Sequence, residues 1–430
     1  MGIAELKLNF SFYLCDFATL REIFIFLFSN AKIMNTSKSP PSVLWMQVWV
    51  LALLQGAITL TWLIYSLYLP QLLTKFGFPV AWAVGILVVE NALAVVMEPL
   101  MGGLSDRARM WVGSRFPFIS AGVILSSALF IAIPCIVTFV PPAEVIRWIL
   151  PIILIAWALA MTIFRSPAIA LLGKYSTPQE LPLAASYVTL AAGIVGAFKG
   201  IANTFVLSLG PVFCFAIASF VLLAVVGALR FVSPPETPTD EHHAETAKLP
   251  LQALSLILPT GFSIAWGIRL LMDALGKVLK SQFNTDDISL LMLWIGLILA
   301  FAALPAGFFA TKIGNRRAML WGVGAIVPAL LAMVYMRAQI PIIFFIVIGF
   351  SLIVNGAIPF ILGIVPGRWA GLGIGIYFGG FSLAMSVFGF IFPPGITPVL
   401  AAIAGALAFS LAGVCIAASD KLATQRNAEV

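Results

Sequence analysis

Twelve long apolar segments, separated by short polar stretches, dominate the chain. A helix needs about 20 apolar residues to cross the roughly 30 Å hydrocarbon core of a bilayer, and its backbone groups are then satisfied within the segment. The apolar positions do not alternate as they would in strands. We therefore predict an all-α membrane protein with twelve transmembrane helices. A window of about 20 residues places them near residues 44–69, 80–102, 117–140, 146–167, 183–208, 211–232, 251–274, 287–308, 318–336, 340–365, 370–393 and 397–419.

The widest polar gap falls between the sixth and seventh predicted helices, over residues 233–246. Its proline, threonine and charged residues are typical of a flexible linker, so the chain divides into two pseudo-symmetric six-helix halves. Residues 1–33 are either an overextended start, because Met34 begins a polar leader of its own, or a surface-lying segment. The predicted organisation is a leader at 1–43, a six-helix bundle at 44–232, a cytoplasmic linker at 233–250, a second six-helix bundle at 251–420 and a tail at 421–430.

Two charged loops, each bounded by glycine, occupy equivalent positions in the two halves. The first follows the second predicted helix, from Gly102 to Phe118, and the second follows the eighth, from Gly307 to Arg317. An internal repeat of this kind is the sequence signature of a secondary transporter.

Composition and charge limit the class further. An apolar content of 61%, a charged content of 10% and a mean hydropathy of +1.08 exclude an ordinary soluble protein. The net charge of +7 comes from short loops rather than from one basic face, so we expect no nucleic-acid partner. Most loop lysines and arginines fall on the side of the two termini, which predicts cytoplasmic termini in a cell membrane, the bacterial inner membrane or its equivalent. No paired cysteines, ATP-binding loop or nucleophile triad stands out, so we expect no cofactor, no metal and no enzymatic activity.

The residues around the first loop resemble a known family. The order Gly102-x-Leu104-x-Asp106-Arg107, followed by Gly113-x-Arg115, resembles the loop between helices two and three of the major facilitator superfamily. Further features are most similar to its glycoside-pentoside-hexuronide and sucrose symporter branch: Glu98-Pro99-Leu100-Met101-Gly102, the long reach from Asp106 to Gly113, Pro117-Phe118-Ile119, and the segment from Phe164 to Gly173. Lys174 and Thr311 depart from that branch, which carries acids at those positions.

The resemblance implies a cytoplasmic gate built from the two loops. In this family the loop acid is understood to brace the inward-closed gate against the amino terminus of a neighbouring helix, which places that role on Asp106. A carboxylate gains favourable electrostatics beside a helix amino terminus and arginines. The alternative is a loop that only anchors in anionic headgroups. The implied gate residues are Gly102, Asp106, Arg107, Gly113 and Arg115 in the first loop and Gly307, Lys312, Gly314, Arg316 and Arg317 in the second.

Ionisable residues inside the predicted spans are the candidates for the transport site. Each costs about 2.5 kcal/mol or more near the bilayer centre, and therefore faces a cavity or a partner. Glu90 and Glu98 lie two turns apart, about 12 Å, near one face of a helix. The resemblance links Glu98 to cation coupling, and the alternative is an interfacial carboxylate paired with loop arginines. The other ionisable candidates are Arg165, Lys199, Arg269 and Asp273, and the polar Asn203 is a candidate beside Lys199.

Three of these candidates have two open interpretations each. Lys199, which shares a helix face with Asn203, either pairs with a carboxylate such as Glu90 or contacts the substrate. Arg269 and Asp273 stand four residues apart, so they either form an ion pair with each other or contact the substrate. We predict that Lys199 and both carboxylates of the second helix border one central cavity.

Glycines at four-residue spacing predict places where helices approach closely. These pairs are Gly196 with Gly200 and Gly375 with Gly379.

Together these features favour a secondary active transporter of a small organic solute, a sugar or glycoside, that works by alternating access. Coupling to a proton or to sodium is left open by the sequence. One alternative is an exporter of amphipathic compounds, and another is a non-transporting assembly or pigment-delivery factor. The costly charges inside the spans argue against the last of these. The expected partners are the solute and the lipid bilayer, and we expect a functional monomer.

Overall fold

The computed structural model describes residues 43–140, 146–234, 249–391 and 396–420. Within these ranges it contains helices and no strand, and twelve spans are long and apolar enough to cross a membrane, which confirms the predicted fold class. The helices of the first half are α2 (Trp45–Lys75), α3 (Trp82–Val112), α4 (Phe116–Phe139), α5 (Ile149–Ala170), α6 (Leu172–Tyr175), α7 (Leu181–Ala197), α8 (Ala202–Ser208) and α9 (Pro211–Val232). Those of the second half are α10 (Leu251–Phe283), α11 (Ser289–Phe301), α12 (Ala303–Ile313), α13 (Asn315–Met336), α14 (Ile340–Ile364), α15 (Ala370–Ile391) and α16 (Pro398–Ala418).

Two spans predicted as continuous helices are interrupted. The fifth span changes to a 3-10 turn at Phe198–Gly200 before α8 begins, at a place where glycine lowers helix propensity. The eighth span divides into α11 and α12 at Ala302. Pro305 lies four residues after Phe301 and has no N–H to donate to its carbonyl, which accounts for the interruption.

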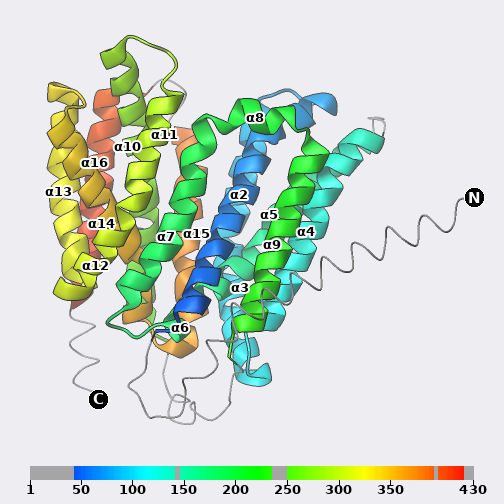
Figure 1. The fold of residues 1–430 in the computed structure, drawn as a ribbon, viewed down its shortest axis with the longest axis horizontal. Coiled ribbons are helices and arrows are strands. Elements are labelled where there is room, and N and C mark those ends of the chain that lie inside the picture. Colours follow the sequence, from blue (N-terminus) through cyan, green and yellow to red (C-terminus); the bar gives the residue numbers. More distant parts are fainter. Residues whose placement is uncertain (1–42, 141–145, 235–248, 392–395, 421–430) are drawn as a thin grey trace, which may run out of the picture. The chain divides into compact units, whose positions relative to one another are not determined.

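The helices pack within each half and along two interfaces between the halves. In the first half α2 packs on α7 and α9, and α4 packs on α5 and α9; in the second half α10 packs on α15 and α16, and α13 on α14 and α16. The halves meet where α3 packs on α15 and where α7 packs on α11 and α12. Figure 1 shows α7 and α15 between the remaining helices of the two halves. Residues 1–42 of the predicted leader, the predicted tail and residues 235–248 of the predicted linker lie outside the described residues.

Glycines allow the α3–α15 interface to close to backbone contact. A Cβ at Gly371 would lie 2.6 Å from the Gly102 carbonyl oxygen, and a Cβ at Gly379 would lie 2.9 Å from the Val95 carbonyl oxygen. Between them, Gly375 rests directly on the backbone of Glu98. The close approach predicted at Gly375 and Gly379 is therefore confirmed.

The α7–α11 interface uses one of the two glycines predicted there, because a Cβ at Gly200 would lie 3.4 Å from the Ser289 carbonyl oxygen at the start of α11. Gly196 has no neighbour within 4 Å of a built Cβ, so the prediction for it was wrong. Instead, a Cβ at Gly193 would lie 2.7 Å from the Ala300 Cβ, and one at Gly296 would lie 2.8 Å from the Ala197 Cβ. Gly193, Ala197 and Gly200 follow at helical spacing on the face that meets α11, and Gly196 lies off that face.

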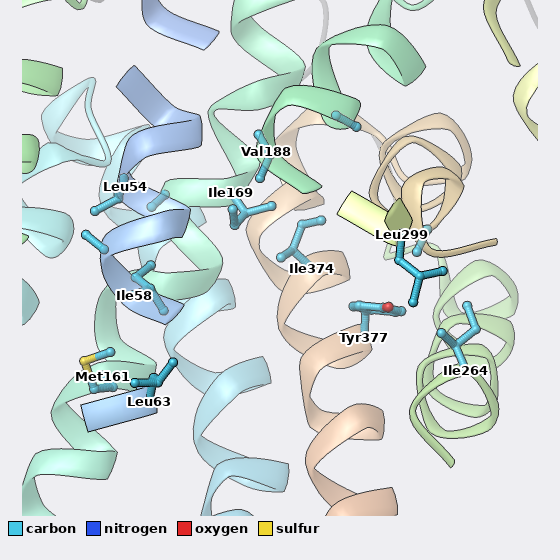
Figure 2. Close-up of a cluster of buried hydrophobic side chains, with 14 of the residues drawn as sticks. Leu54, Ile58, Leu63, Met161, Ile169, Val188, Ile264, Leu299, Ile374 and Tyr377 are labelled. Atoms are coloured by element: carbon cyan, nitrogen blue, oxygen red, sulfur yellow. The ribbon is translucent and has the colours of Figure 1, made fainter. Parts of the chain in front are cut away.

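Buried apolar side chains from both halves join in one cluster. Figure 2 shows Leu54, Ile58, Met161, Ile169 and Val188 from the first half together with Ile264, Leu299, Ile374 and Tyr377 from the second. Side chains of both halves therefore belong to one buried apolar core in this conformation.

Candidate functional site

A buried ion pair on α3 and α5 forms the centre of the candidate site. The Glu98 side chain is fully buried, and its Oε1 lies 2.5 Å from Nη2 of Arg165. The neighbouring Ser166 donates a hydrogen bond to Oε2. The Arg165 guanidinium also lies 4.2 Å from the ring centroid of Phe378 on α15. A cation from the first half therefore contacts both a carboxylate of its own half and an aromatic ring of the other half.

The second carboxylate, Glu90, has a different environment. Only 3% of Glu90 is exposed, and its Oε1 accepts a hydrogen bond from the Tyr65 hydroxyl. Its Oε2 has no hydrogen-bond partner, and no basic side chain pairs with it among the described residues. The Tyr65 ring packs on Trp157 at 4.4 Å between centroids, and Trp157 packs on Trp62 at 4.8 Å. Glu90 is thus a buried acid held by aromatic side chains rather than by a cation.

The two carboxylates border one cavity of about 40 Å³. This volume holds about three water molecules, and it is far below the roughly 300 Å³ of a typical small-molecule pocket. Within the described ranges, Trp62 Nε1 is a buried donor without a hydrogen-bond partner, and Glu90 Oε2 is a buried acceptor without one. The lining residues are Trp62, Glu90, Asn91, Ala94, Glu98, Ala158, Met161, Thr162, Arg165 and Ser382.

The first loop joins the two halves at one end of α3. The Asp106 carboxylate is 2% exposed and lies 2.5 Å from Nη2 of Arg115, at the start of α4. It also accepts hydrogen bonds from the backbone N–H groups of Gly371, at 3.0 Å, and Leu372, at 2.8 Å. These groups belong to the first turn of α15, where free N–H groups and the helix dipole favour an anion.

Other residues of the first loop shape this junction. Gly102 lies against the Gly371 backbone, where a side chain would not fit. Gly113 ends α3 with a φ of 76°, in the left-handed region that glycine adopts without strain. Arg115 Nη2 also donates to the Gly367 carbonyl oxygen at 3.4 Å, whereas Arg107 is exposed.

The second loop makes no equivalent charged junction in the described part of the chain. Thr311, at the position that corresponds to Asp106, donates its hydroxyl to the Phe308 carbonyl of its own helix. Gly307 does pack across the halves, where a Cβ would lie 2.7 Å from the Ser186 Cβ. The remaining predicted gate residues stay within the second half. Gly314 ends α12 with a φ of 93°, and the Lys312 ammonium lies over the Phe308 ring. Arg316 donates hydrogen bonds to the Ile416 and Ala417 carbonyl oxygens at the end of α16. Arg317 is exposed.

The structure separates Lys199 and the α10 residues from the two carboxylates. Lys199 is not among the residues that line the cavity, and it makes no ion pair with Glu90 in the described chain. Of the two interpretations of Arg269 and Asp273, the ion pair between them is not found in the described part of the chain. Asp273 Oδ2 instead lies 2.7 Å from Nζ of Lys277, and the Arg269 guanidinium lies 4.9 Å from the Phe388 ring centroid.

Several residues of the site were not found from the sequence. Tyr65, Ser166 and Phe378 carry ordinary side chains with no local signal, and only tertiary packing brings them to the carboxylates. Lys277 could have been found, because it stands four residues after Asp273 on one helix face. The side chain of Asn203 lies outside the described residues.

A family model described as "Major Facilitator Superfamily" matches residues 51–389. The chain belongs to this superfamily. It is therefore a membrane transporter and not an enzyme. None of the curated proteins matches the chain.

Known structures of the Major Facilitator Superfamily share this fold. The chain is similar to a proton:xylose symporter, XylE, at a TM-score of 0.67 and 14% identity, with 86% of this chain and 94% of that chain covered. It is similar to the Escherichia coli fucose:proton symporter at a TM-score of 0.60 and 11% identity, covering 86% and 97%. It is also similar to the human organic anion transporter MFSD10 at a TM-score of 0.58 and 16% identity, covering 90% and 99%. At these identities the likeness shows the fold alone.

Proposed function

We propose that this Major Facilitator Superfamily protein is a proton-coupled transporter of a small hydroxyl-rich solute, a sugar or glycoside, that works by alternating access. The observation that carries the proposal is Glu90. It is a buried carboxyl group on the cavity, and among the described residues one of its oxygens has no partner and no cation pairs with it. An ionised carboxylate is costly in such surroundings, so Glu90 binds a proton here and releases it when water reaches the cavity.

The neighbouring ion pair of Glu98 and Arg165 connects the charge state of the α3 carboxylates to the second half. Arg165 contacts Glu98 on α3 and Phe378 on α15. A change in the charge of the α3 carboxylates therefore changes the strength of the contact between Arg165 and Phe378. The α3–α15 interface is one of the two along which the halves meet. Proton binding and movement of the halves are thereby linked through one side chain.

The cavity lining supports a hydroxyl-rich solute. The indole of Trp62 offers an aromatic face and a free N–H, while Asn91, Thr162 and Ser382 offer polar groups. Such mixed surfaces bind sugars by stacking and hydrogen bonding. A monosaccharide does not fit in about 40 Å³, so the solute enters when the halves separate. The sugar:proton symporters that share the fold are consistent with this solute class.

Uptake into proteoliposomes tests the proposal. The panel contains labelled glucose, xylose, sucrose, a hexuronide and an amphipathic amine, each with a pH gradient, a sodium gradient or none. We expect an inward proton gradient to accumulate a sugar, and Glu90→Gln to abolish accumulation while sugar exchange without a gradient continues. Glu180→Gln is the matched control, because Glu180 lies at the start of α7, away from the cavity lining.

Each other outcome changes a specific part of the proposal. Sugar flux that ignores both gradients would remove the coupling, and accumulation driven only by sodium would replace the proton. Extrusion of the amine without sugar uptake would favour the amphipathic-compound exporter. Full accumulation by Glu90→Gln would show that Glu90 does not carry the proton.

A further inference from the structure

The two interfaces between the halves are joined by different chemistry at the end of the molecule that contains Asp106. On the α3–α15 side, the two oxygens of the Asp106 carboxylate accept backbone N–H groups of the other half, at 3.0 Å from Gly371 and 2.8 Å from Leu372. Hydrogen bonds to an ionised acceptor are roughly twice as strong as neutral ones. This junction therefore joins the halves firmly.

On the other side, α14 meets α7 through the neutral side chain of Asn355. Its Nδ2 donates a hydrogen bond to the carbonyl oxygen of Pro182, the second residue of α7, at 3.2 Å, which is the long end of the range for N–H···O bonds. Asn355 is only 2% exposed, and its Oδ1 has no hydrogen-bond partner among the described residues. The contact therefore gives the amide nitrogen a partner and leaves the amide oxygen without one.

A second polar group on the same face of α14 is also buried without a hydrogen bond. Ser351 stands four residues before Asn355, is 2% exposed, and its Oγ has no partner within the described ranges. A buried polar group in this state has lost its hydrogen bonds to water and gained none from the protein. Both groups would regain hydrogen bonds if α7 and α14 separated and admitted water. They therefore favour separation of this junction.

Small residues let α7 and α12 approach closely beside the Asn355 contact. A Cβ at Gly307 would lie 2.8 Å from Ser186 Oγ and 2.9 Å from the Pro182 carbonyl oxygen. The Ser186 hydroxyl donates to the Leu183 carbonyl oxygen of its own helix. Close packing, rather than a hydrogen bond donated by Ser186, therefore joins α7 to α12 here.

We propose that this end of the molecule opens first between α7 and α14, while the α3–α15 junction at Asp106 stays joined and acts as the hinge. Asn355 and Ser351 are the residues that make the α7–α14 junction the weaker of the two. Water, and then the solute, reaches the interior between α7 and the second half. The inference rests on the proposed function only for the separation of the halves during transport.

Two buried serines give a matched measurement of opening at the two junctions. Ser186 lies against Gly307 and Ser105 lies against Gly371, where a built Cβ would be 2.8 Å and 2.9 Å from the respective Oγ atoms, and both serines are 0% exposed. Each is changed singly to cysteine in a protein without other cysteines, and alkylation by iodoacetamide is followed in neutral detergent without solute or gradient. We expect Ser186→Cys to react about tenfold or more faster than Ser105→Cys. The rates after unfolding in dodecyl sulfate correct for the intrinsic reactivity of the two thiols.

Substitutions on α14 test the physical cause of the opening. Asn355→Leu keeps the size of the side chain and removes the oxygen that has no partner, so Ser186→Cys should react about tenfold more slowly while Ser105→Cys is unchanged. Ser351→Ala removes a single oxygen atom and should act in the same direction. Ser255→Ala is the matched control, because Ser255 is exposed on α10 and donates to the Gln252 carbonyl of its own helix, and it should change neither rate.

Two results would overturn the proposal. Equal rates, or a faster reaction of Ser105→Cys, would contradict the order of opening. Acceleration of Ser186→Cys by Asn355→Leu would show that Asn355 keeps the junction closed. Because labelling needs no transport, the expected labelling without any sugar uptake would uphold the order of opening and remove the proposed function, whereas proton-driven sugar uptake with equal labelling rates would do the reverse.

Discussion

Asp106 binds groups from both halves of the molecule. It holds Arg115 and two N–H groups of α15 at once, and both charged side chains are buried. Breaking a buried ion pair by removing one partner typically costs about 3–5 kcal/mol, because the other charge is left uncompensated. The charge of this one residue therefore stabilises the conformation in which α3 and α15 are joined.

Asp106→Asn should give a folded, inserted protein that spends less time in this joined conformation. We expect the transport rate to fall about tenfold or more, which corresponds to about 1.4 kcal/mol. Uptake into proteoliposomes measures the rate, and size-exclusion chromatography checks folding. Asp286→Asn, on the exposed loop after α10, is the control. Unchanged uptake at normal expression would mean that the loop only anchors the protein in headgroups.

Glu90 and Glu98 should differ in what they contribute to stability. Glu98→Gln leaves the Arg165 charge without its partner and should lower the free energy of unfolding by about 3 kcal/mol. Glu90→Gln leaves no cation behind and keeps a hydrogen-bonding side chain beside Tyr65, so a loss below about 1 kcal/mol is expected. Thermal unfolding followed by tryptophan fluorescence compares the two variants. Equal losses would contradict the assignment of different environments to the two carboxylates.

At the scale of the helix, the α3–α15 interface depends on glycine. Gly371, Gly375 and Gly379 recur every four residues on the face of α15 that meets α3, and none has room for a Cβ. Gly375→Ala should therefore separate the two helices and weaken the joined conformation. Gly196→Ala is the matched control, because Gly196 has no neighbour within 4 Å and the substitution should stabilise α7 by about 0.5–1 kcal/mol.

Disulfide formation between Gly103→Cys and Leu372→Cys, in a background without other cysteines, measures the separation. A Cβ at Gly103 would lie 3.6 Å from the Leu372 Cδ1, so the two side chains face each other across the interface and should cross-link in the otherwise unchanged protein. Gly375→Ala should slow it about tenfold, and Gly196→Ala should not. Equal rates in both variants would show that α15 accommodates a side chain at residue 375 without moving.

At the scale of the whole molecule, twelve spans place the start of α2 and the end of α16 on the same side of the membrane. We predict that this side is cytoplasmic and includes both charged loops. Single cysteines at Arg107 and Arg317 should resist a membrane-impermeant thiol reagent in intact cells, whereas a cysteine at Lys280 should react. Both arginines and Lys280 are exposed, so access depends only on the side. Labelling of either loop from outside would reverse the orientation.

The sequence by itself determined the number of membrane spans and the all-α fold class, since the length of an apolar run decides locally whether a segment spans a bilayer. The acid of the first loop could also be identified from the sequence, because Asp106 and Arg115 lie within one short motif. Tertiary structure alone decided the partners of the buried charges. Ser166 reaches Glu98 across 68 residues, and Tyr65 reaches Glu90 from another helix. The tertiary structure also pairs Asp273 with Lys277 rather than with Arg269. Four-residue spacing permits either pair, and only the packed neighbours, Phe388 beside Arg269 and the Ile396 carbonyl beside Lys277, select between them.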